Sequence, residues 1–68
     1  MEKDMQLTKQ DRAFAEKCME THKMSMEYWP YGDERYTCID INGDLCIAYE
    51  NGAWWHYREN RAGYIEWW

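Results

Sequence analysis

Cysteine and histidine are the residue types in this chain whose chemistry is most distinctive. Cys18 and His22 are four residues apart, the spacing that places two side chains on one face of a helix. Cys38, Cys46 and His56 occur where neighbouring strands of a sheet can bring side chains together. Thiolate and imidazole groups bind zinc, and a thiol beside an imidazole can act as a nucleophile. These five residues are therefore the first candidates for a metal site or a catalytic site.

The spacing of these candidates matches neither kind of site. Many zinc sites contain two cysteines separated by two residues, and the sequence has no such pair. A nucleophilic site needs a third orienting group and an oxyanion hole, and neither is identifiable around either cysteine–histidine pair. We therefore predict no cofactor, no bound metal and no enzymatic activity, with the cysteines serving as small core residues.

The first part of the chain has the pattern of one amphipathic helix. Thr8 and Asp11 form a Thr-x-x-Asp cap, in which the side chains accept hydrogen bonds from unpaired amides. A stripe with spacings of three to five residues follows, at Phe14, Cys18, Met19, His22 and Met26. Pro30 cannot continue the hydrogen-bond ladder and restricts the residue before it. We predict a helix over about residues 8–26.

The second half of the chain carries the signals of antiparallel hairpins. Asn42-Gly43 and Asn51-Gly52 each lie between runs in which apolar and polar residues alternate. We expect each Asn-Gly pair to supply the positive φ that a tight turn requires. A third connection, residues 59–63, precedes a last short run. The sequence predicts an α+β fold with one N-terminal helix packed on a four-stranded antiparallel β-meander, with strands over about residues 36–41, 45–50, 53–58 and 64–68.

Side-chain alternation divides this predicted sheet into two faces. A three-residue turn at each Asn-Gly site keeps the large aliphatic residues on one face, whereas a two-residue turn would separate them. The apolar face then holds Thr37, Ile39, Leu45, Ile47, Tyr49, Trp55, Tyr57, Ile65 and Trp67. The second, mixed face holds Tyr36, Cys38, Asp40, Cys46, Ala48, Trp54, His56, Arg58, Tyr64, Glu66 and Trp68. We expect the helix to cover the apolar face, so that its cysteine and histidine lie on the opposite side of the sheet from those of the strands.

The mixed face is the predicted binding surface. A core made from 68 residues is too small to enclose all five tryptophans. Aromatic rings beside arginine are typical of the residues that dominate protein interfaces. We predict that a partner is bound by Tyr36, Trp54, His56, Arg58, Tyr64 and Trp68. Two alternatives stay open: the rings pack on one another across strands, or the face binds a small ligand or stacked nucleic-acid bases.

Charge and composition narrow the class of protein. Thirteen acidic and eight Lys or Arg residues give a net charge of −5, which repels phosphate and disfavours direct binding of nucleic acid. The chain has no apolar run of about 18 residues that could span a membrane, and its N-terminus lacks the apolar segment of a signal peptide. Three cysteines, an odd number, suit reduced thiols better than a disulfide framework. We expect a complete single-domain protein, residues 1–68, of the cytoplasm.

These observations together predict a small acidic protein-interaction module. It would act by binding and occluding a partner protein, as an inhibitor or accessory factor of the kind that phages and mobile elements encode. A homodimer is a second form of the same prediction, because exposed rings beside an open strand edge favour self-association. The alternative function is a small ligand- or metal-binding domain that uses the aromatic, cysteine and histidine side chains of the mixed face.

Overall fold

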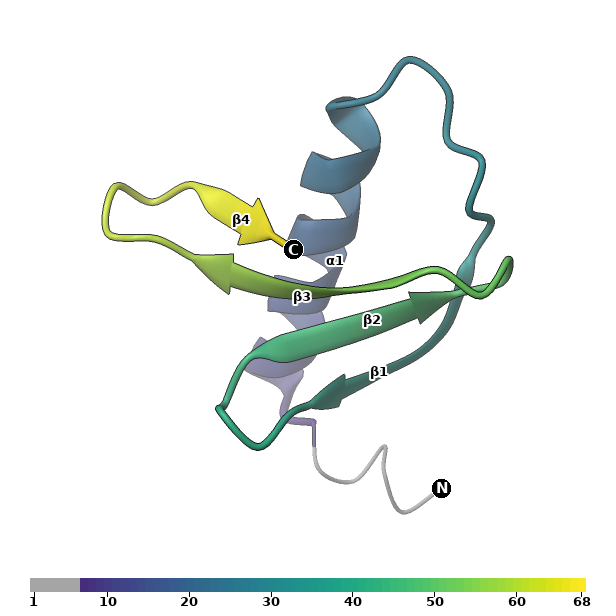
Figure 1. The fold of residues 1–68 in the computed structure, drawn as a ribbon. Helices are drawn as coiled ribbons and strands as arrows, with labels where there is room; N and C mark the ends of the chain where they lie inside the picture. Colours follow the sequence, from purple (N-terminus) through teal and green to yellow (C-terminus); the bar gives the residue numbers. More distant parts are fainter. Residues whose placement is uncertain (1–6) are drawn as a thin grey trace.

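The computed structural model of this protein describes residues 7–68, and the first six residues of the expected domain lie outside the described part. One helix, α1 (Lys9–Met24), precedes four strands, β1 (Glu34–Ile39), β2 (Leu45–Tyr49), β3 (Trp54–Glu59) and β4 (Ile65–Trp67). The strands form one antiparallel sheet in the order β1-β2-β3-β4, and α1 lies behind it (Figure 1). The predicted fold, a helix on a four-stranded meander, is confirmed.

Both ends of α1 are fixed by side chains. Thr8 Oγ1 accepts a hydrogen bond from the Asp11 amide at 2.9 Å, and Asp11 Oδ2 accepts one from the Thr8 amide at 3.0 Å. This is the predicted cap. The helix ends at Met24, two residues earlier than expected, because the amide and hydroxyl of Ser25 both donate to the His22 carbonyl. Within residues 7–68, no helix combines the length and the apolar character needed to cross a membrane.

All three hairpins use the same three-residue turn. In each, a glycine amide donates to the carbonyl three residues earlier over 3.0 Å. The three glycines have φ of +87° at Gly43, +98° at Gly52 and +89° at Gly63. The turn length expected at the two Asn-Gly sites is therefore confirmed. Each Asn-Gly pair supplies the expected positive φ through its glycine, and no described residue other than glycine has one. This turn type needs a left-handed residue only at its last position.

The strand boundaries differ from the predicted ones mainly in β1. It begins two residues earlier than predicted and also ends two residues earlier. The early end arises because Asp40 already forms the turn, where its amide donates to the Asp44 carbonyl at 2.9 Å. Near its start, the register shifts between Glu34 and Tyr36. Such a bulge reverses side-chain direction, and Glu34 accepts a 2.6 Å hydrogen bond from Arg12 of α1. β4 is shorter than predicted, but the Trp68 backbone still pairs with His56 of β3 at 3.1 and 3.2 Å.

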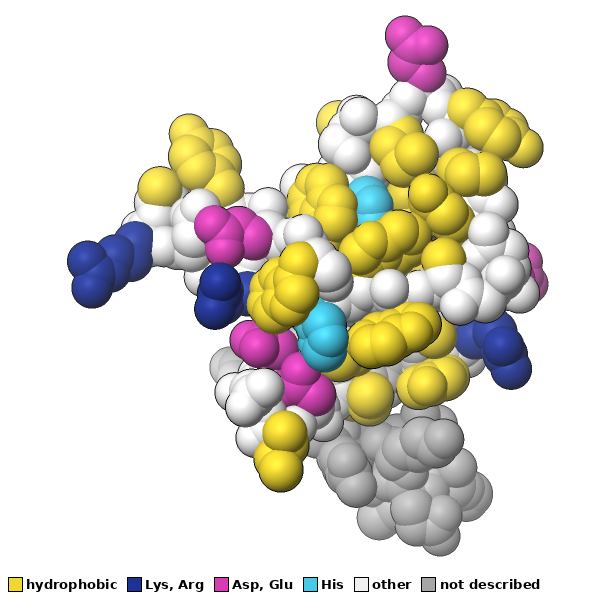
Figure 2. Space-filling model, viewed as in Figure 1, with side chains coloured by type: hydrophobic (Ala, Val, Ile, Leu, Met, Phe, Trp, Pro, Cys, Tyr) yellow, Lys and Arg dark blue, Asp and Glu magenta, His cyan; other side chains and the backbone are white. Residues whose placement is uncertain are grey.

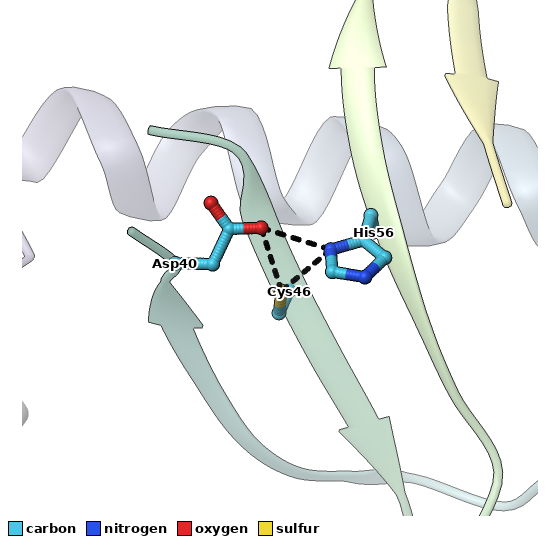
Figure 3. Close-up of side chains that lie close together, drawn as sticks. All are labelled: Asp40, Cys46 and His56. Atoms are coloured by element: carbon cyan, nitrogen blue, oxygen red, sulfur yellow. Dashed lines mark hydrogen bonds and ion pairs between the residues drawn. The ribbon is translucent and has the colours of Figure 1, made fainter. Parts of the chain in front are cut away.

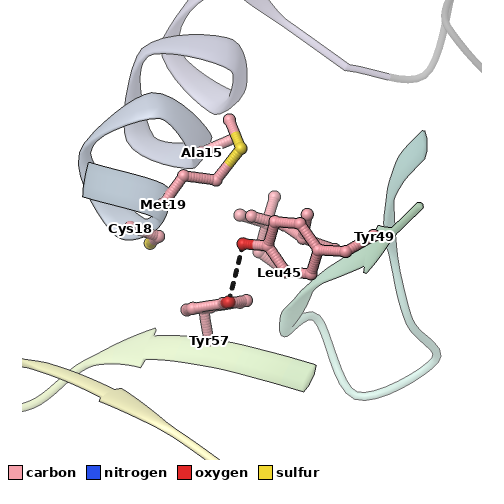
Figure 4. Packing of buried hydrophobic residues seen from close by; sticks show 7 residues of the cluster. Ala15, Cys18, Met19, Leu45, Tyr49 and Tyr57 are labelled. Atoms are coloured by element: carbon pink, nitrogen blue, oxygen red, sulfur yellow. Dashed lines mark hydrogen bonds between the residues drawn. The ribbon is translucent and has the colours of Figure 1, made fainter. Parts of the chain in front are cut away.

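The predicted separation of the two sheet faces is confirmed by the core. Buried side chains of α1 pack against buried side chains of β2 and β3 (Figure 4), in a cluster of Ala15, Cys18, Met19, Leu45, Ile47, Tyr49 and Tyr57. Partly buried residues that pack on this cluster include Ile39, Trp55, Ile65 and Trp67. Thr37, also expected on this side, is buried. The choice of a three-residue turn therefore assigned the helix-facing side chains correctly.

The C-terminal part of α1 is buried in an aromatic cage around His22. The imidazole is only 4% exposed. Its ring contacts five aromatic side chains, contributed by the loop after α1 and by β3 and β4: Trp29, Tyr31, Trp55, Tyr57 and Trp67. His22 Nδ1 lies 2.7 Å from Tyr57 Oη, which lies 2.8 Å from Tyr49 Oη. This buried polar chain satisfies the hydrogen-bonding groups that the core encloses.

Candidate functional site

The face of the sheet turned away from α1 (Figure 1) is here called the open face, and the strand register places on it the residues predicted for binding. Seen from this side, hydrophobic and charged side chains lie next to one another (Figure 2). Strand pairing arranges its side chains in rows across the sheet. One row contains Tyr36, Ala48 and Trp54. The next contains Cys38, Cys46, His56 and Trp68. Arg58 and Glu66 form a third row on β3 and β4. The register therefore brings aromatic, sulfur and charged groups together on one surface.

Four of the six predicted contact residues form what we call the aromatic strip: Trp54, His56, Trp68 and Arg58. The His56 ring lies edge-on to Trp54, with centroids 5.1 Å apart, and is stacked on Trp68 at 5.2 Å and 19°. The Arg58 guanidinium lies 5.0 Å from the centre of the Trp68 ring. Despite these contacts, Trp54 and Trp68 remain 58% and 50% exposed. The rings pack on each other and still present apolar surface to solvent.

The other two predicted contact residues lie beside this strip. Tyr36 is opposite Ala48, one strand further from Trp54, and is 48% exposed. Tyr64 is at the tip of the hairpin between β3 and β4, where its backbone pairs with Asn60, and it is 71% exposed. Tyr36 thus extends the aromatic surface, whereas Tyr64 lies at its margin.

Next to the strip, three side chains from three segments converge on one point (Figure 3). His56 Nδ1 on β3 lies 3.0 Å from Asp40 Oδ2 and 3.1 Å from Cys46 Sγ. Cys46 Sγ on β2 lies 3.7 Å from the same Asp40 oxygen. We call this group the polar triangle. A carboxylate, a thiol and an imidazole each contribute one atom that could bind a metal ion, and these three atoms lie within 4.8 Å of one another.

The turn between β1 and β2 fixes the carboxylate of the triangle. Asp40 Oδ1 accepts hydrogen bonds from the amides of Asn42 at 2.8 Å and Asp44 at 2.9 Å. The hydrogen bond from Asp44 is the largest single influence on this carboxyl. Together with those from Asn42 and His56 it outweighs desolvation, and the pKa of Asp40 is lowered. With Oδ1 engaged in the turn, Oδ2 is left to face the other two side chains.

The triangle does not have the arrangement of a nucleophilic cysteine. Burial, followed by the negative charge of Asp40, raises the pKa of Cys46 to about 11, so the thiol stays protonated at neutral pH. The carboxylate and the thiol also contact the same imidazole nitrogen. In a catalytic triad the carboxylate orients the histidine through the opposite ring nitrogen. The geometry is that of three possible metal-ligand atoms around one point rather than that of a proton relay.

The second cysteine–histidine pair belongs to the core. Cys18 is fully buried, and this burial raises its pKa to about 11. His22 Nδ1 faces the Tyr57 hydroxyl. As expected from the sequence, this pair lies on the opposite side of the sheet from Cys38, Cys46 and His56. Cys46 and His56 meet in the polar triangle, and Cys38 is the cross-strand neighbour of Cys46.

The sequence did not identify Asp40 as a possible metal ligand. It was placed on the mixed face but was not grouped with the cysteines and histidine. The available signal was its position three residues before Gly43, because Asp or Asn at the start of a turn accepts hydrogen bonds from the amides that follow. Asn60 has the same position relative to Gly63 and makes the same two kinds of bond.

Comparison with known proteins assigns no identity to this arrangement. No protein-family model matches the chain, and no match is found among curated proteins or among solved structures.

Proposed function

We propose that this chain is a protein-interaction module whose binding surface is the open face of the sheet. The single observation that carries the proposal is the exposure of Trp54 and Trp68, at 58% and 50%, within a packed strip. His56 and Arg58 hold the Trp68 ring from two directions. A ring that is already held in place loses little conformational freedom on binding, and exposed tryptophan and arginine dominate many interfaces.

The partner we propose is a protein that presents basic side chains next to an apolar surface. The chain carries a net charge of −5, so it attracts positively charged proteins at a distance. Within the strip, Arg58 is already paired with Glu66 at 3.3 Å, and His56 faces Asp40 at 3.0 Å. A second copy of the chain would bring the same negative charge and would be repelled. Self-association is therefore the less favoured use of this face.

Binding through this face would act by occlusion. The strip and Tyr36 form a broad surface without an activated nucleophile, which suits an inhibitor or accessory factor that covers part of its partner. Cys38 and Cys46 lie on the same face as the binding surface. A compartment that keeps thiols reduced, such as the cytoplasm, therefore suits this role.

The test compares two double variants. Trp54→Ser with Trp68→Ser removes the two rings of the strip. Met24→Ser with Tyr28→Ser is the matched control, because these residues are 78% and 76% exposed and lie at the end of α1 and just after it. Proteins captured from the native host by the parent chain are purified and titrated against all three forms by calorimetry. The strip variant should bind at least about 30-fold more weakly, since each hot-spot side chain contributes about 2 kcal/mol or more.

Two results would change this conclusion. A captured partner that binds the strip variant as tightly as the parent and control would overturn the proposed surface. Sedimentation velocity over a range of concentrations tests whether the face instead binds a second copy of this chain. A dimer formed by the parent and the control but absent in the strip variant would identify the partner as another copy of this chain. Affinity for a basic partner should also fall as salt is raised.

A further inference from the structure

We propose that the polar triangle is a binding site for one borderline-soft divalent cation such as Zn²⁺, held by Asp40 Oδ2, Cys46 Sγ and His56 Nδ1. The inference goes beyond the proposed interface and does not depend on it. It also revises the expectation of a metal-free chain. That expectation rested on the absence of a Cys-x-x-Cys motif, whereas these ligands come from one turn and two strands and leave no local sequence motif.

Two of the three distances between the ligand atoms are a few tenths of an ångström shorter than those that a tetrahedral zinc ion imposes, and the third is slightly longer. Zinc binds sulfur at about 2.3 Å and nitrogen or oxygen at about 2.0–2.2 Å, which places tetrahedral ligands about 3.3–3.6 Å apart. The three separations in the triangle are 3.0, 3.1 and 3.7 Å. An ion can therefore be accommodated by side-chain shifts of a few tenths of an ångström, without any change of strand register.

Two of the three ligands are oriented by neighbouring groups before any ion arrives. The Asp40 carboxylate is held through Oδ1 by the amides of Asn42 and Asp44. The His56 ring is held between Trp54 and Trp68. Hydrogen bonds and packing that orient metal ligands are a regular feature of real metal sites and contribute strongly to affinity.

The donor set is chemically suited to this class of ion. A thiolate and an imidazole select zinc-like cations over Mg²⁺ or Ca²⁺, which prefer oxygen ligands. On binding, the Cys46 thiol releases its proton to solvent and becomes a thiolate. The proton that His56 donates from Nδ1 to Asp40 in the metal-free chain is also given up to solvent, and the neutral ring then carries its proton on Nε2 and presents the Nδ1 lone pair to the ion. The carboxylate and the thiolate together balance the two positive charges of the ion.

The fourth position of a tetrahedral ion at this site faces outward. The side chains of Asp40 and His56 keep 18% and 26% exposure, so the triangle lies at the surface of the open face. Three protein ligands with one open position leave room for water or for a donor group of another molecule.

The hairpin between β3 and β4 supplies the design of the sharpest variant. Asn60 accepts hydrogen bonds from the Ala62 and Tyr64 amides at 2.9 and 3.0 Å, as Asp40 does in its own turn. An asparagine can therefore form this turn. Asp40→Asn should keep the β1–β2 hairpin intact while replacing the anionic ligand with a neutral amide.

The experiment is a titration of the full-length chain, without a histidine tag, in a non-chelating reductant after removal of metals. Co²⁺ serves as the spectroscopic probe and Zn²⁺ as the competitor. One Co²⁺ per chain should bind with a thiolate-to-cobalt charge-transfer band and the visible bands of tetrahedral cobalt, and Zn²⁺ should displace it. Cys46→Ser and His56→Gln should weaken binding by more than about 100-fold, because even outer partners of metal ligands change affinity by about 10–100-fold.

The controls separate this site from unspecific thiol binding. Cys38→Ser changes a cysteine on the same face and in the same row, and it should leave the affinity and the band unchanged. Asp40→Asn should weaken binding at least about 10-fold while the circular dichroism spectrum stays that of the parent. The proposal is overturned if the parent shows no charge-transfer band. It is equally overturned if the band survives in Cys46→Ser or disappears in Cys38→Ser. Since the partner titrations test Trp54 and Trp68 and neither residue is a metal ligand, failure here leaves the proposed interface standing.

Discussion

The two histidines of this protein lie on opposite faces of the sheet, and each is flanked by two tryptophans in a similar arrangement. The sequence contains two Trp-Trp pairs, at residues 54–55 and 67–68, and strand alternation sends one ring of each pair to each face. His22 is edge-on to Trp55 and stacked on Trp67, with centroids at 4.7 and 4.4 Å. His56 repeats this geometry with the other ring of each pair, at 5.1 and 5.2 Å.

What differs is the polar partner and the access of solvent. His22 faces the Tyr57 hydroxyl inside a closed cage, and burial lowers its pKa. His56 faces the Asp40 carboxylate and the Cys46 thiol at the surface. Flanking rings alone therefore do not assign a role to a histidine. His22, with a neutral partner and full burial, is a core residue, whereas His56, partly exposed beside an acid and a buried thiol, belongs to the set of ligands that we propose.

The largest expected difference between the two is in stability. His22→Ala should lower the free energy of unfolding by about 3–5 kcal/mol, as loss of a buried aromatic ring does, and leave a chain of this size largely unfolded. His56→Ala should lower it by about 1 kcal/mol or less, because the side chain is at the surface. Urea unfolding followed by circular dichroism measures both. Equal losses in the two variants would contradict the distinction.

A smaller effect is expected from the hydroxyl that serves His22. Tyr57→Phe leaves the ring in place but removes the bridge between His22 and Tyr49. Buried polar groups without partners cost about 1–3 kcal/mol, and the urea midpoint should fall accordingly. Tyr64→Phe is the matched control, since Tyr64 is 71% exposed, and its midpoint should stay that of the parent. Similar shifts in both would show that the buried chain contributes nothing specific.

The smallest expected effect is a pH dependence that comes from His22. Because burial lowers its pKa in the folded state, the unfolded chain takes up a proton first as the pH falls. Stability should therefore decrease below about pH 6.5, by at most about 1.4 kcal/mol per pH unit. Carboxylates with lowered pKa values, such as Glu34 and Glu66, add to this loss only at lower pH.

Two measurements check this dependence. The midpoint of urea unfolding is followed between pH 7.5 and about pH 5, a range that ends above the ordinary pKa of carboxylates. In parallel, the histidine ring protons are titrated by NMR, with the His22 signal assigned from the spectrum of His56→Gln. A His22 midpoint at or above the ordinary histidine pKa of about 6.5 would contradict the expectation.

The sequence was sufficient for the elements that local rules determine. Thr8 and Asp11 identified the start of the helix, and the two Asn-Gly pairs identified two hairpins with the correct turn length. With that length, the sides of Leu45 and Trp55 followed from alternation. These features depend on residues close together in the chain, for which capping, turn and alternation rules hold.

Other features depended on contacts between distant residues. Pro30 indicated that the helix does not continue, but no local rule indicates that Trp29 and Tyr31 turn back onto His22. The bulge next to Tyr36, which directs Glu34 toward Arg12, likewise has no local signature. The triangle was half foreseen, with Cys46 and His56 as possible neighbours, and the approach of Asp40 required the geometry of the turn.

The order of the strands has a consequence for how this protein folds. Every strand pairs with its neighbour in the sequence, so each hairpin can close a short loop, an event of about 1–10 μs. The cage around His22 is different, because its hydrogen bond to Tyr57 spans 35 residues and its stack on Trp67 reaches the last strand. It cannot be completed until β3 and β4 have paired. We expect the meander to form early and the docking of α1 to be the late, slower step, which makes the cage the natural starting point of unfolding.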